Sequence, residues 1–163
     1  MPADAELLDA WHTPEFLGAF NQFGVPHEPM RAAIEKTGLV GDHAGQLIVE
    51  TVSGEEPVGT VSWHSVRYGP NPESTVLNVG INLIPSARGH GFGGIAQRML
   101  AQYLFANTSV NRLEAMTDVD NLAEQRALEK AGFRREGVAR GAQFRAGEWR
   151  DLVVYSLLRD EAS

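Results

Sequence analysis

The sequence predicts an α+β fold: a mixed, mainly antiparallel central sheet with a splayed parallel strand pair and flanking helices. Three observations predict it. Short runs between residues 46 and 84, in which apolar and polar residues alternate, are typical of strands joined by turns. A glycine-rich segment, residues 88–94, precedes an apolar-periodic stretch that indicates a helix. A second strand and helix follow in residues 112–131, so the two strands are expected to run parallel.

The first 36 residues are expected to form short helices. The stretch from Asp4 to Lys36 is interrupted at Thr13-Pro14 and again at Pro26 and Pro29, and proline interrupts helices. Large apolar side chains at helical spacing predict one buried face in this region: Trp11, Phe16, Leu17, Phe20 and Phe23.

The middle of the chain is expected to hold three strands and a long helix. Residues 46–52 and 57–66 predict a hairpin, and residues 75–84 a third strand. Gly80 inside that strand indicates a bulge or a close backbone approach. The helix is expected over residues 91–105, with an inner side formed by Ile95, Met99, Leu100, Tyr103 and Leu104.

The remaining elements complete the order βββαβαββ after the N-terminal helices. Residues 112–117 predict a strand and residues 122–131 a helix that Asp120 or Asn121 can cap. Gly132 supplies the left-handed residue that ends this helix. Residues 133–139 and 149–158 predict the last two strands, with Gly147 in the turn between them.

Length and composition exclude several function classes. The 163 residues suit a single domain over residues 1–163, and a formal charge of −7 argues against nucleic-acid binding. The absence of cysteine excludes disulfides, thiolate metal sites and a cysteine nucleophile, and the five histidines show no ligand spacing, so no metal site is expected. With no signal-peptide core or membrane-length apolar run, the sequence predicts a cytoplasmic protein without membrane contact.

The most informative segment is Arg88-Gly89-His90-Gly91-Phe92-Gly93-Gly94. Glycines let the backbone approach a ligand closely, and the following helix directs its unpaired N–H groups into the same space. The helix dipole favours negative charge there, so the segment predicts a phosphate or pyrophosphate site. Arg88 would add a guanidinium suited to phosphate.

Three known glycine-rich patterns bear on the function of this loop. Gly89-x-Gly91-x-x-Gly94 satisfies the dinucleotide fingerprint, with Glu114 or Asp118 near the distance of a ribose-binding acid. However, a hairpin-like region rather than repeated βαβ units surrounds it. A P-loop is excluded because no Lys-Ser/Thr pair follows the glycines. The acyl-CoA pyrophosphate pattern Arg/Gln-x-x-Gly-x-Gly/Ala fits residues 88–93 at every position.

Two parallel strands that are each followed by a helix leave a crevice at their carboxyl ends. In that context the chain strongly resembles the GNAT superfamily of acyl-CoA N-acyltransferases, and within it the ribosomal-protein N-terminal acetyltransferases. The resemblance covers about residues 11–159 and depends on these motifs: Pro57-Val58-Gly59-Thr60, Val79-Gly80, Ile84-Pro85, Arg88-Gly89-x-Gly91-x-Gly93, Asn121…Glu129-Lys130-x-Gly132-Phe133 and Gly147-x-Trp149-x-Asp151…Tyr155-Ser156-Leu157.

The resemblance implies acetyl-CoA as the acyl donor and CoA as product. The pyrophosphate would lie on the amides of Arg88, Gly89, His90, Gly91, Phe92, Gly93 and Gly94. The pantetheine arm would pair with the strand edge at Leu83 and Ile84, and Asn121 would hydrogen-bond it from the neighbouring strand. A backbone N–H near Leu83 would stabilise the oxyanion.

The chain departs from this family at the catalytic positions. The acidic residue expected two positions before the strand glycine is Asn78, which cannot accept a proton. The hydroxyl residue expected three positions after the helix asparagine is Glu124, and an expected tyrosine is Leu128. The candidates for the general base are therefore His64, Glu73 and Glu124, with a water-mediated route as the alternative.

These patterns together predict an N-acetyltransferase in which a primary amine attacks the thioester directly in a ternary complex. The expected acceptor is an amine-bearing small molecule or a protein N-terminus, and the final hairpin makes a homodimer plausible. A non-catalytic acyl-CoA-binding module and a nicotinamide dinucleotide-binding enzyme are the competing predictions.

Overall fold

A computed structural model of the chain describes residues 2–24 and 29–162. Its helices are α1 (Pro2–Ala10), α2 (Pro14–Leu17), α3 (Met30–Thr37), α4 (Phe92–Asn107) and α5 (Leu122–Ala131). Its strands are β1 (Ala44–Glu50), β2 (Pro57–Arg67), β3 (Thr75–Leu83), β4 (Arg112–Asp118), β5 (Arg134–Arg145) and β6 (Glu148–Leu158). Single 3-10 turns are η1 (Pro72–Ser74), η2 (Pro85–Ala87) and η3 (Arg159–Glu161). The predicted order βββαβαββ is confirmed.

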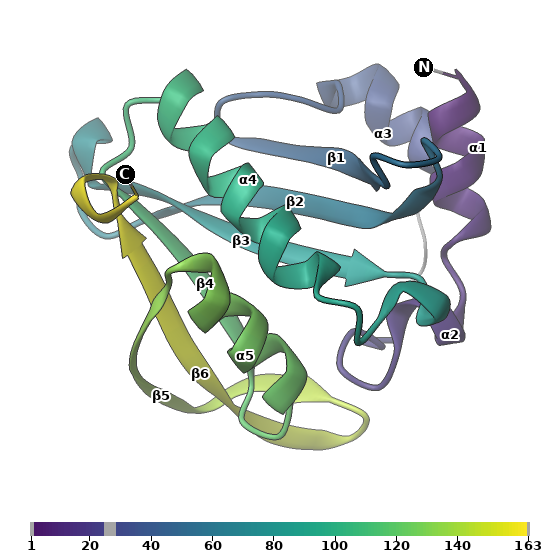
Figure 1. Ribbon diagram of the computed structural model, residues 1–163. Helices are drawn as coiled ribbons and strands as arrows, with labels where there is room; N and C mark the ends of the chain where they lie inside the picture. The colour runs from purple at the N-terminus through teal and green to yellow at the C-terminus, as the bar shows by residue number, and fades with distance from the viewer. Residues whose placement is uncertain (1, 25–28, 163) are drawn as a thin grey trace.

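The strands form one sheet in the order β1-β2-β3-β4-β6-β5, in which β3 and β4 are parallel and the other neighbours antiparallel. The parallel ladder pairs Leu77 with Leu113 and Asn78 with Glu114, near the start of each strand. Beyond these pairs the two strands run apart towards their carboxyl ends (Figure 1). The sheet is therefore split at the place that the sequence predicts.

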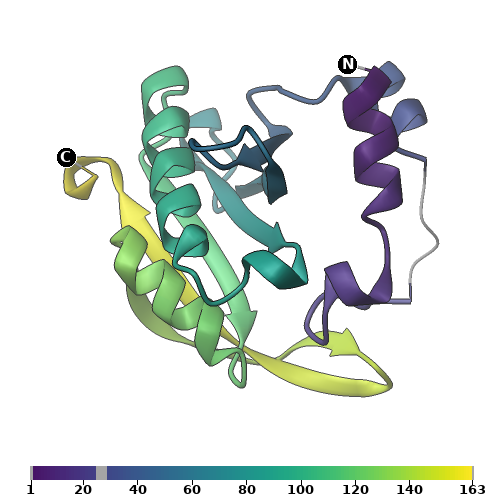
Figure 2. The ribbon, with the colours of Figure 1, turned by 45° about the vertical axis from the view of Figure 1, so that its right-hand side comes forward.

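Helices α4 and α5 lie side by side on one face of the sheet (Figures 1 and 2). A Cβ on Gly94 would lie 3.3 Å from the Ala127 carbonyl oxygen and from Lys130 Cβ, so glycine allows this close approach. The core beneath the two helices is aliphatic and aromatic, and its most buried members include Leu77, Leu104, Leu113, Leu128 and Tyr155. Packing of this kind fixes the position of α4 relative to the split.

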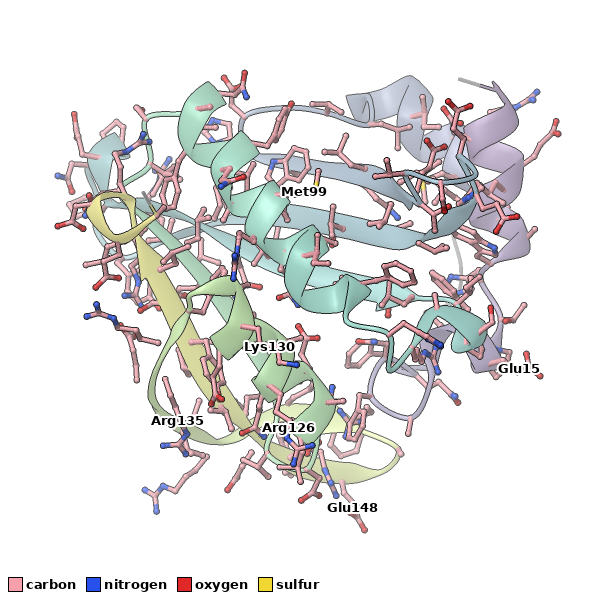
Figure 3. All side chains as sticks on the ribbon, in the orientation of Figure 1. Glu15, Met99, Arg126, Lys130, Arg135 and Glu148 are labelled. Carbon is pink, nitrogen blue, oxygen red and sulfur yellow. The ribbon has the colours of Figure 1, made fainter. Side chains whose placement is uncertain are left out.

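The predicted inner side of α4 is wrong in part. Leu100 and Leu104 are buried, but Ile95 and Met99 are 60% and 63% exposed, and Tyr103 lies at the edge of the core against Trp63. The buried side of α4 also includes the small residues Gly94, Ala96 and Ala101, which allow α4 to pack closely against α5 and the sheet. Met99 is seen on the outer side of the helix in Figure 3.

The bulge predicted at Gly80 is also wrong. The β2–β3 register runs without a shift from Gly59–Leu83 to Arg67–Thr75. The close approach is present, because a Cβ on Gly80 would lie 3.3 Å from Ser62 Oγ. Gly80 instead lies two residues beyond the last β3–β4 pair, within the split.

The N-terminal helices follow the prediction, although the proposed break at Pro26 lies outside the described residues. Phe16 is buried and stacks on Trp11 at 5.3 Å between ring centroids, whereas Phe23 is half exposed. In the described ranges no helix combines the length and apolarity that a membrane crossing requires.

The last hairpin is longer than predicted. β5 continues to Arg145, because the register shift between Ala139 and Gln143 absorbs the turn-like Gly141 within the strand. The turn consists of Ala146 and Gly147, whose φ angles are 52° and 83°. Two successive positive φ angles are typical of the tight hairpin turn that fits the twist of the strands.

Candidate functional site

A cavity of about 530 Å³ lies where β3 and β4 separate. It is bounded by residues 17–21 at and after the end of α2, by the end of β3, by the glycine loop and by one side of α5. Its lining includes Leu83, Gly89, Gly91, Asn121, Glu124, Arg126 and Lys130. The two strand-then-helix units thus contribute to one site, as the sequence predicts.

The amino end of α4 faces this cavity without a side-chain cap among the described residues. Its N-cap residue, Gly91, is left-handed with φ 85°, and Gly89 has φ 79°. A Cβ at either glycine would meet no atom within 4 Å. Unpaired N–H groups at the start of a 16-residue helix therefore border open space, which is the arrangement that an anion site requires.

The cavity is rich in cations although the protein is acidic. Arg126 and Lys130 lie one turn apart on α5, both exposed, and both line the cavity (Figure 3). Glu124 is the carboxylate among the described lining residues, whereas the whole chain carries a formal charge of −7. This local excess of positive charge favours an anionic ligand.

The Arg88 side chain does not extend to the phosphate position that the sequence suggests. Its Nε donates to the Leu83 carbonyl at 3.0 Å, and its Nη2 donates to the carbonyls of Glu15 and Phe16 at 2.9 and 2.7 Å. These acceptors include unpaired carbonyls of α2, which a guanidinium satisfies well. Arg88 therefore ties the glycine loop to the N-terminal region.

Two further contacts hold residues 15–21, the strap, over the cavity. Arg145 donates to the Phe20 carbonyl at 3.2 Å and lies 5.3 Å from the centre of the Phe20 ring. Asn21 donates to Asn82 Oδ1 at 2.8 Å. Figure 2 shows the strap between the loop before α4 and the tip of the β5–β6 hairpin. The strap therefore forms one wall of the cavity.

The end of β3 presents backbone groups of Leu83 to the cavity. The Ile84 N–H donates to the Val58 carbonyl on the β2 side at 2.9 Å. Because backbone groups alternate in direction along a strand, the groups of Leu83 point to the opposite side, towards the split. The Leu83 carbonyl accepts from Arg88 there, and its N–H faces the same side. Ile84 is thus paired with β2, and Leu83 borders the site.

Asn121, rather than Asp120, caps α5. Its Oδ1 accepts from the Glu124 N–H at 3.4 Å, and its Nδ2 donates to Thr117 Oγ1 at 3.0 Å. Asp120 instead accepts from Arg150 at 2.7 Å. The Asn121 amide is therefore fixed in orientation at the end of β4, where it lines the cavity.

Of the three predicted catalytic candidates, Glu124 lies in the cavity. Burial raises the pKa of its carboxyl from the usual value near 4.5 to about 8, against the effect of a hydrogen bond from the Gln97 side chain. A carboxyl that titrates near neutral pH can both give and accept a proton under working conditions.

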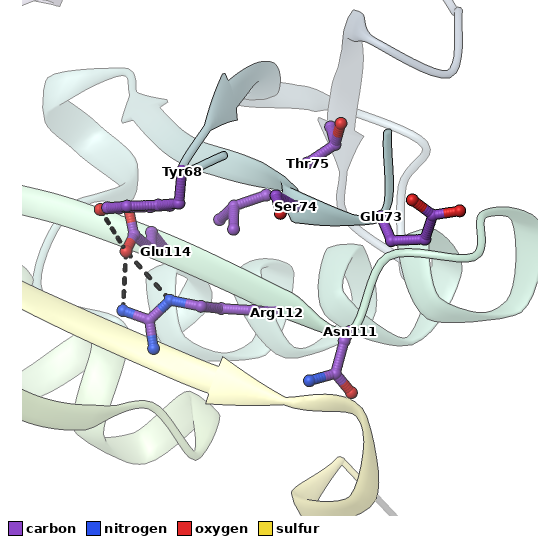
Figure 4. A pocket seen from close by; sticks show the side chains of 8 residues that line it. Tyr68, Glu73, Ser74, Thr75, Asn111, Arg112 and Glu114 are labelled. Atoms are coloured by element: carbon purple, nitrogen blue, oxygen red, sulfur yellow. Dashed lines mark hydrogen bonds and ion pairs between the residues drawn. The ribbon is translucent and has the colours of Figure 1, made fainter. Parts of the chain in front are cut away.

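His64 and Glu73 lie elsewhere. His64 is exposed on β2 and pairs in register with Asn78, outside the described lining of the cavity. Glu73 belongs to η1 and lines a different cavity, of about 390 Å³, at the start of β3 (Figure 4). In that cavity Glu114 is fully paired, since it accepts from Tyr68 at 2.8 Å and from Arg112 at 2.7 Å.

Sequence reasoning missed several residues that shape the site. Arg126 and Lys130 had a signal, because cations four positions apart share one face of a helix. Asp118 had none. Burial alone would raise the pKa of Asp118, but hydrogen bonds from Arg150, the Asp120 backbone and Arg145 lower it to about 2. This ion cluster joins β4 to the hairpin that supports the strap.

The free energy of unfolding is expected to fall as the pH rises from about 5 to about 8. Folded Glu124 keeps its proton up to about pH 8, whereas in the unfolded chain it loses the proton near pH 4.5. The unfolded state therefore binds fewer protons across this interval, and each pH unit removes at most about 1.4 kcal/mol of stability. Urea unfolding of the coenzyme-free protein at several pH values measures this slope.

Glu124→Gln removes the titrating group and is expected to flatten the slope. The hydrogen bond from Arg112 is the main cause that lowers the pKa of Glu136 to about 2, and Asp118 also titrates near 2. The stability that these two groups contribute is therefore lost only at acid pH, outside this interval. An unchanged slope in the variant would show that Glu124 is ionised in the folded protein at neutral pH.

Comparisons with known proteins agree on one family. The family profile described as "Acetyltransferase (GNAT) domain" matches residues 1–134. The chain is 32% identical over 157 residues to the probable N-acetyltransferase YjcK of Bacillus subtilis (strain 168), covering 96% of the chain and 85% of YjcK. It is 34% identical over 103 residues to the putative ribosomal N-acetyltransferase YdaF of the same strain, covering 63% of the chain and 54% of YdaF.

The fold is shared with a solved structure of known ligands. The crystal structure of spermidine N-acetyltransferase from Vibrio cholerae in complex with CoA and spermine matches with a TM-score of 0.82 and 17% identity, over 99% of this chain and 94% of that one. A dinucleotide-binding fold would instead need a mainly parallel sheet. The resemblance predicted from the sequence is therefore confirmed, and the chain belongs to the GNAT acetyltransferase family of acyl-CoA-dependent enzymes.

Proposed function

We propose that this enzyme transfers an acetyl group from acetyl-CoA to a primary amine by direct attack of the amine in a ternary complex. The observation that carries the proposal is the uncapped amino end of α4 in a cation-rich cavity at the split of the sheet. The chain contains no cysteine that could carry the acyl group covalently. Direct transfer between two bound substrates fits this composition.

The cavity offers partners for each part of the donor. Backbone amides in the segment from Gly89 to Gly94 suit the diphosphate, because the start of α4 has no side-chain cap among the described residues, a Cβ at Gly89 or Gly91 would meet no atom within 4 Å, and the α4 dipole favours anions. The Leu83 N–H suits the pantetheine arm or the thioester oxygen, and the fixed amide of Asn121 suits the arm from the opposite side. Such fixed donors place the thioester, which lowers the entropic part of the barrier.

Glu124 is the acid–base residue that this geometry favours. It lines the cavity and has a pKa raised by burial to about 8, whereas His64 and Glu73 lie outside the described lining. A lysine-like acceptor amine has a pKa near 10 and a chain N-terminus near 8, so either acceptor must lose a proton before attack. A carboxyl at the junction of α4 and α5 supplies the group through which protons can move.

The acceptor class is an amine on a small molecule or at a protein N-terminus. The names of two relatives support both possibilities, since one enzyme acts on spermidine and the other is called ribosomal. The acidic balance of the chain favours a cationic acceptor in either case.

Two measurements test the proposal. Calorimetry should detect CoA binding to the free protein, and release of free thiol from acetyl-CoA should then depend on an added amine. A panel containing polyamines, amino acids and N-terminal peptides identifies the acceptor. Binding of CoA without amine-dependent thiol release across this panel would favour the non-catalytic acyl-CoA-binding module.

Arg126 and Lys130 are expected to recognise the terminal phosphate of CoA. Replacing both with alanine should weaken CoA binding by about tenfold to a hundredfold, because exposed charge-assisted contacts of this kind contribute roughly 1–3 kcal/mol together. Binding of 3′-dephospho-CoA should change little. Calorimetry with CoA and with 3′-dephospho-CoA measures both affinities. If the variant loses the same affinity for both ligands, the two cations contact the diphosphate instead of the terminal phosphate.

A further inference from the structure

The Arg88 side chain joins separate parts of the cavity wall. Its Nε donates to the Leu83 carbonyl at 3.0 Å, at the end of β3. Its Nη2 has two hydrogens and donates to the carbonyls of Glu15 and Phe16, in the strap, at 2.9 and 2.7 Å. The backbone of the same residue begins the glycine loop. One guanidinium therefore connects the glycine loop, the end of β3 and the strap.

The backbone of the strap is shaped to meet this guanidinium. Because α2 is a single turn, its last carbonyls have no donor within the helix. Hydrogen bonds from a charged donor to such carbonyls are stronger than those between neutral groups. Gly18, which ends α2, has φ 63° and ψ −176°, a conformation that is open almost only to glycine. A Cβ on Gly18 would lie 3.5 Å from Arg88 Nη1, so the strap passes directly beside the guanidinium.

The other contacts of the strap lead away from the glycine loop. Asn21 holds the strap to β3, and Arg145 holds it to the β5–β6 hairpin. In the part of the chain that the structure describes, the hydrogen bonds between the strap and residues 88–94 all come from Arg88. The strap lies beside the loop before α4 in Figure 2. A ligand that fixes the loop therefore acts on the strap through this one side chain.

A phosphate contact would take Arg88 away from these carbonyls. Its Nε and both hydrogens of Nη2 already have acceptors. If the side chain turned towards a phosphate, the carbonyls of Glu15 and Phe16 would lose their charged donor. Arg126 and Lys130 are exposed cations of the same cavity and can meet phosphate groups without such a loss. The geometry therefore favours the strap over the phosphate as the partner of Arg88.

We propose that Arg88 is a positioning residue that couples the glycine loop to the acceptor side of the cavity. Coenzyme bound at the loop amides holds the loop, and Arg88 then holds the strap and the Leu83 carbonyl in place. The wall beside the acceptor amine is thus fixed once the donor is bound. The effect on the amine rests on the proposed acetyltransferase function, whereas the effect on the strap needs only coenzyme binding.

Hydrogen exchange of the strap tests this coupling, with CoA as the probe. Mass spectrometry follows the amides of residues 15–21 in the free protein and in the CoA-saturated protein. In the wild type, CoA should slow their exchange by about fivefold or more, the lower end of typical coupling between sites. Arg88→Met keeps a long side chain but has no donor, so CoA should slow the exchange by less than about twofold. Calorimetry should find the CoA dissociation constant of this variant within about threefold of the wild type, as for other exposed substitutions.

Arg98→Met is the matched control. Arg98 is also exposed and also donates to a backbone carbonyl, that of Lys130, but it makes no contact with the strap among the described residues. This variant should keep the CoA-dependent protection of the strap. Arg88→Lys should restore part of the protection that Arg88→Met loses. A lysine carries a single ammonium and cannot reach β3 and the strap at once as the planar fork of arginine does.

Equal protection of the strap in wild type and Arg88→Met would overturn the proposal, because CoA would then cover the strap directly. No protection in the wild type would overturn it as well. A CoA affinity weakened by about tenfold or more in Arg88→Met would show that the guanidinium binds phosphate instead.

Steady-state kinetics test the acceptor side, with the amine that the activity panel identifies. At saturating acetyl-CoA, Arg88→Met should raise KM for this amine by about tenfold and change kcat much less, because a loosened wall weakens binding of the amine throughout the reaction. An unchanged KM would overturn the acceptor role. If no amine is acetylated while CoA still protects the strap through Arg88, the proposed function fails and the coupling stands.

Discussion

Gly91→Val is expected to abolish coenzyme binding, with the dissociation constant of CoA raised at least about a hundredfold. Gly91 has φ 85° and is the N-cap residue of α4 at the edge of the cavity. A branched side chain there would lie in the space that the diphosphate needs and would cover the first amides of the helix. Calorimetry with CoA on the purified variant measures the loss.

The matched control is Gly147→Val. Gly147 has φ 83°, and a Cβ on it would likewise meet no atom within 4 Å, but it belongs to the turn between β5 and β6. Both variants bear the same left-handed strain, about 1–2 kcal/mol, so their melting temperatures should fall by similar amounts. Only Gly91→Val should lose CoA. Equal weakening in both variants would attribute the loss to general destabilisation, and retained binding in Gly91→Val would refute the anion site.

Elements marked by local signals could be predicted from the sequence. The predicted limits of α5, residues 122–131, agree with the structure because Asn121 caps its start and left-handed Gly132 ends it. The β2–β3 pairing and the split followed from alternating patterns and from two consecutive strand-then-helix units. Each of these signals lies within a few residues of the feature that it determines.

Features that depend on distant partners could not be predicted. Arg88 fits a phosphate site by its position in the loop, but its acceptors on Glu15 and Phe16 lie 73 and 72 residues earlier in the chain. The inner side of α4 was predicted wrongly at Ile95 and Met99, because periodicity cannot tell whether small or large residues face a closely packed helix. The sequence likewise could not choose between Glu124, His64 and Glu73, because only the fold shows that Glu124 lies in the cavity.

Glu124→Gln is expected to lower kcat by about a hundredfold to a thousandfold, within the range that general acid–base catalysis supplies. The glutamine keeps the size of the side chain and can still form hydrogen bonds, so the fold and CoA binding should be preserved. It cannot give or accept a proton during the transfer. In the wild type, kcat should also decline as the pH rises above about 8 and Glu124 ionises. The variant should lack this decline.

Glu73→Gln provides the comparison, because it makes the same chemical change in the separate cavity at the start of β3. Its kcat is expected to stay within about twofold of the wild type, as exposed substitutions away from a site have small effects. Loss of turnover in both variants would indicate that the cavity beside η1 also takes part in the reaction. Full turnover in Glu124→Gln would leave water as the proton route and would show that the half-buried Glu124 carboxyl has no part in proton transfer. The combination of unchanged CoA affinity with low kcat separates a group that acts on the reacting atoms from one that only holds the donor.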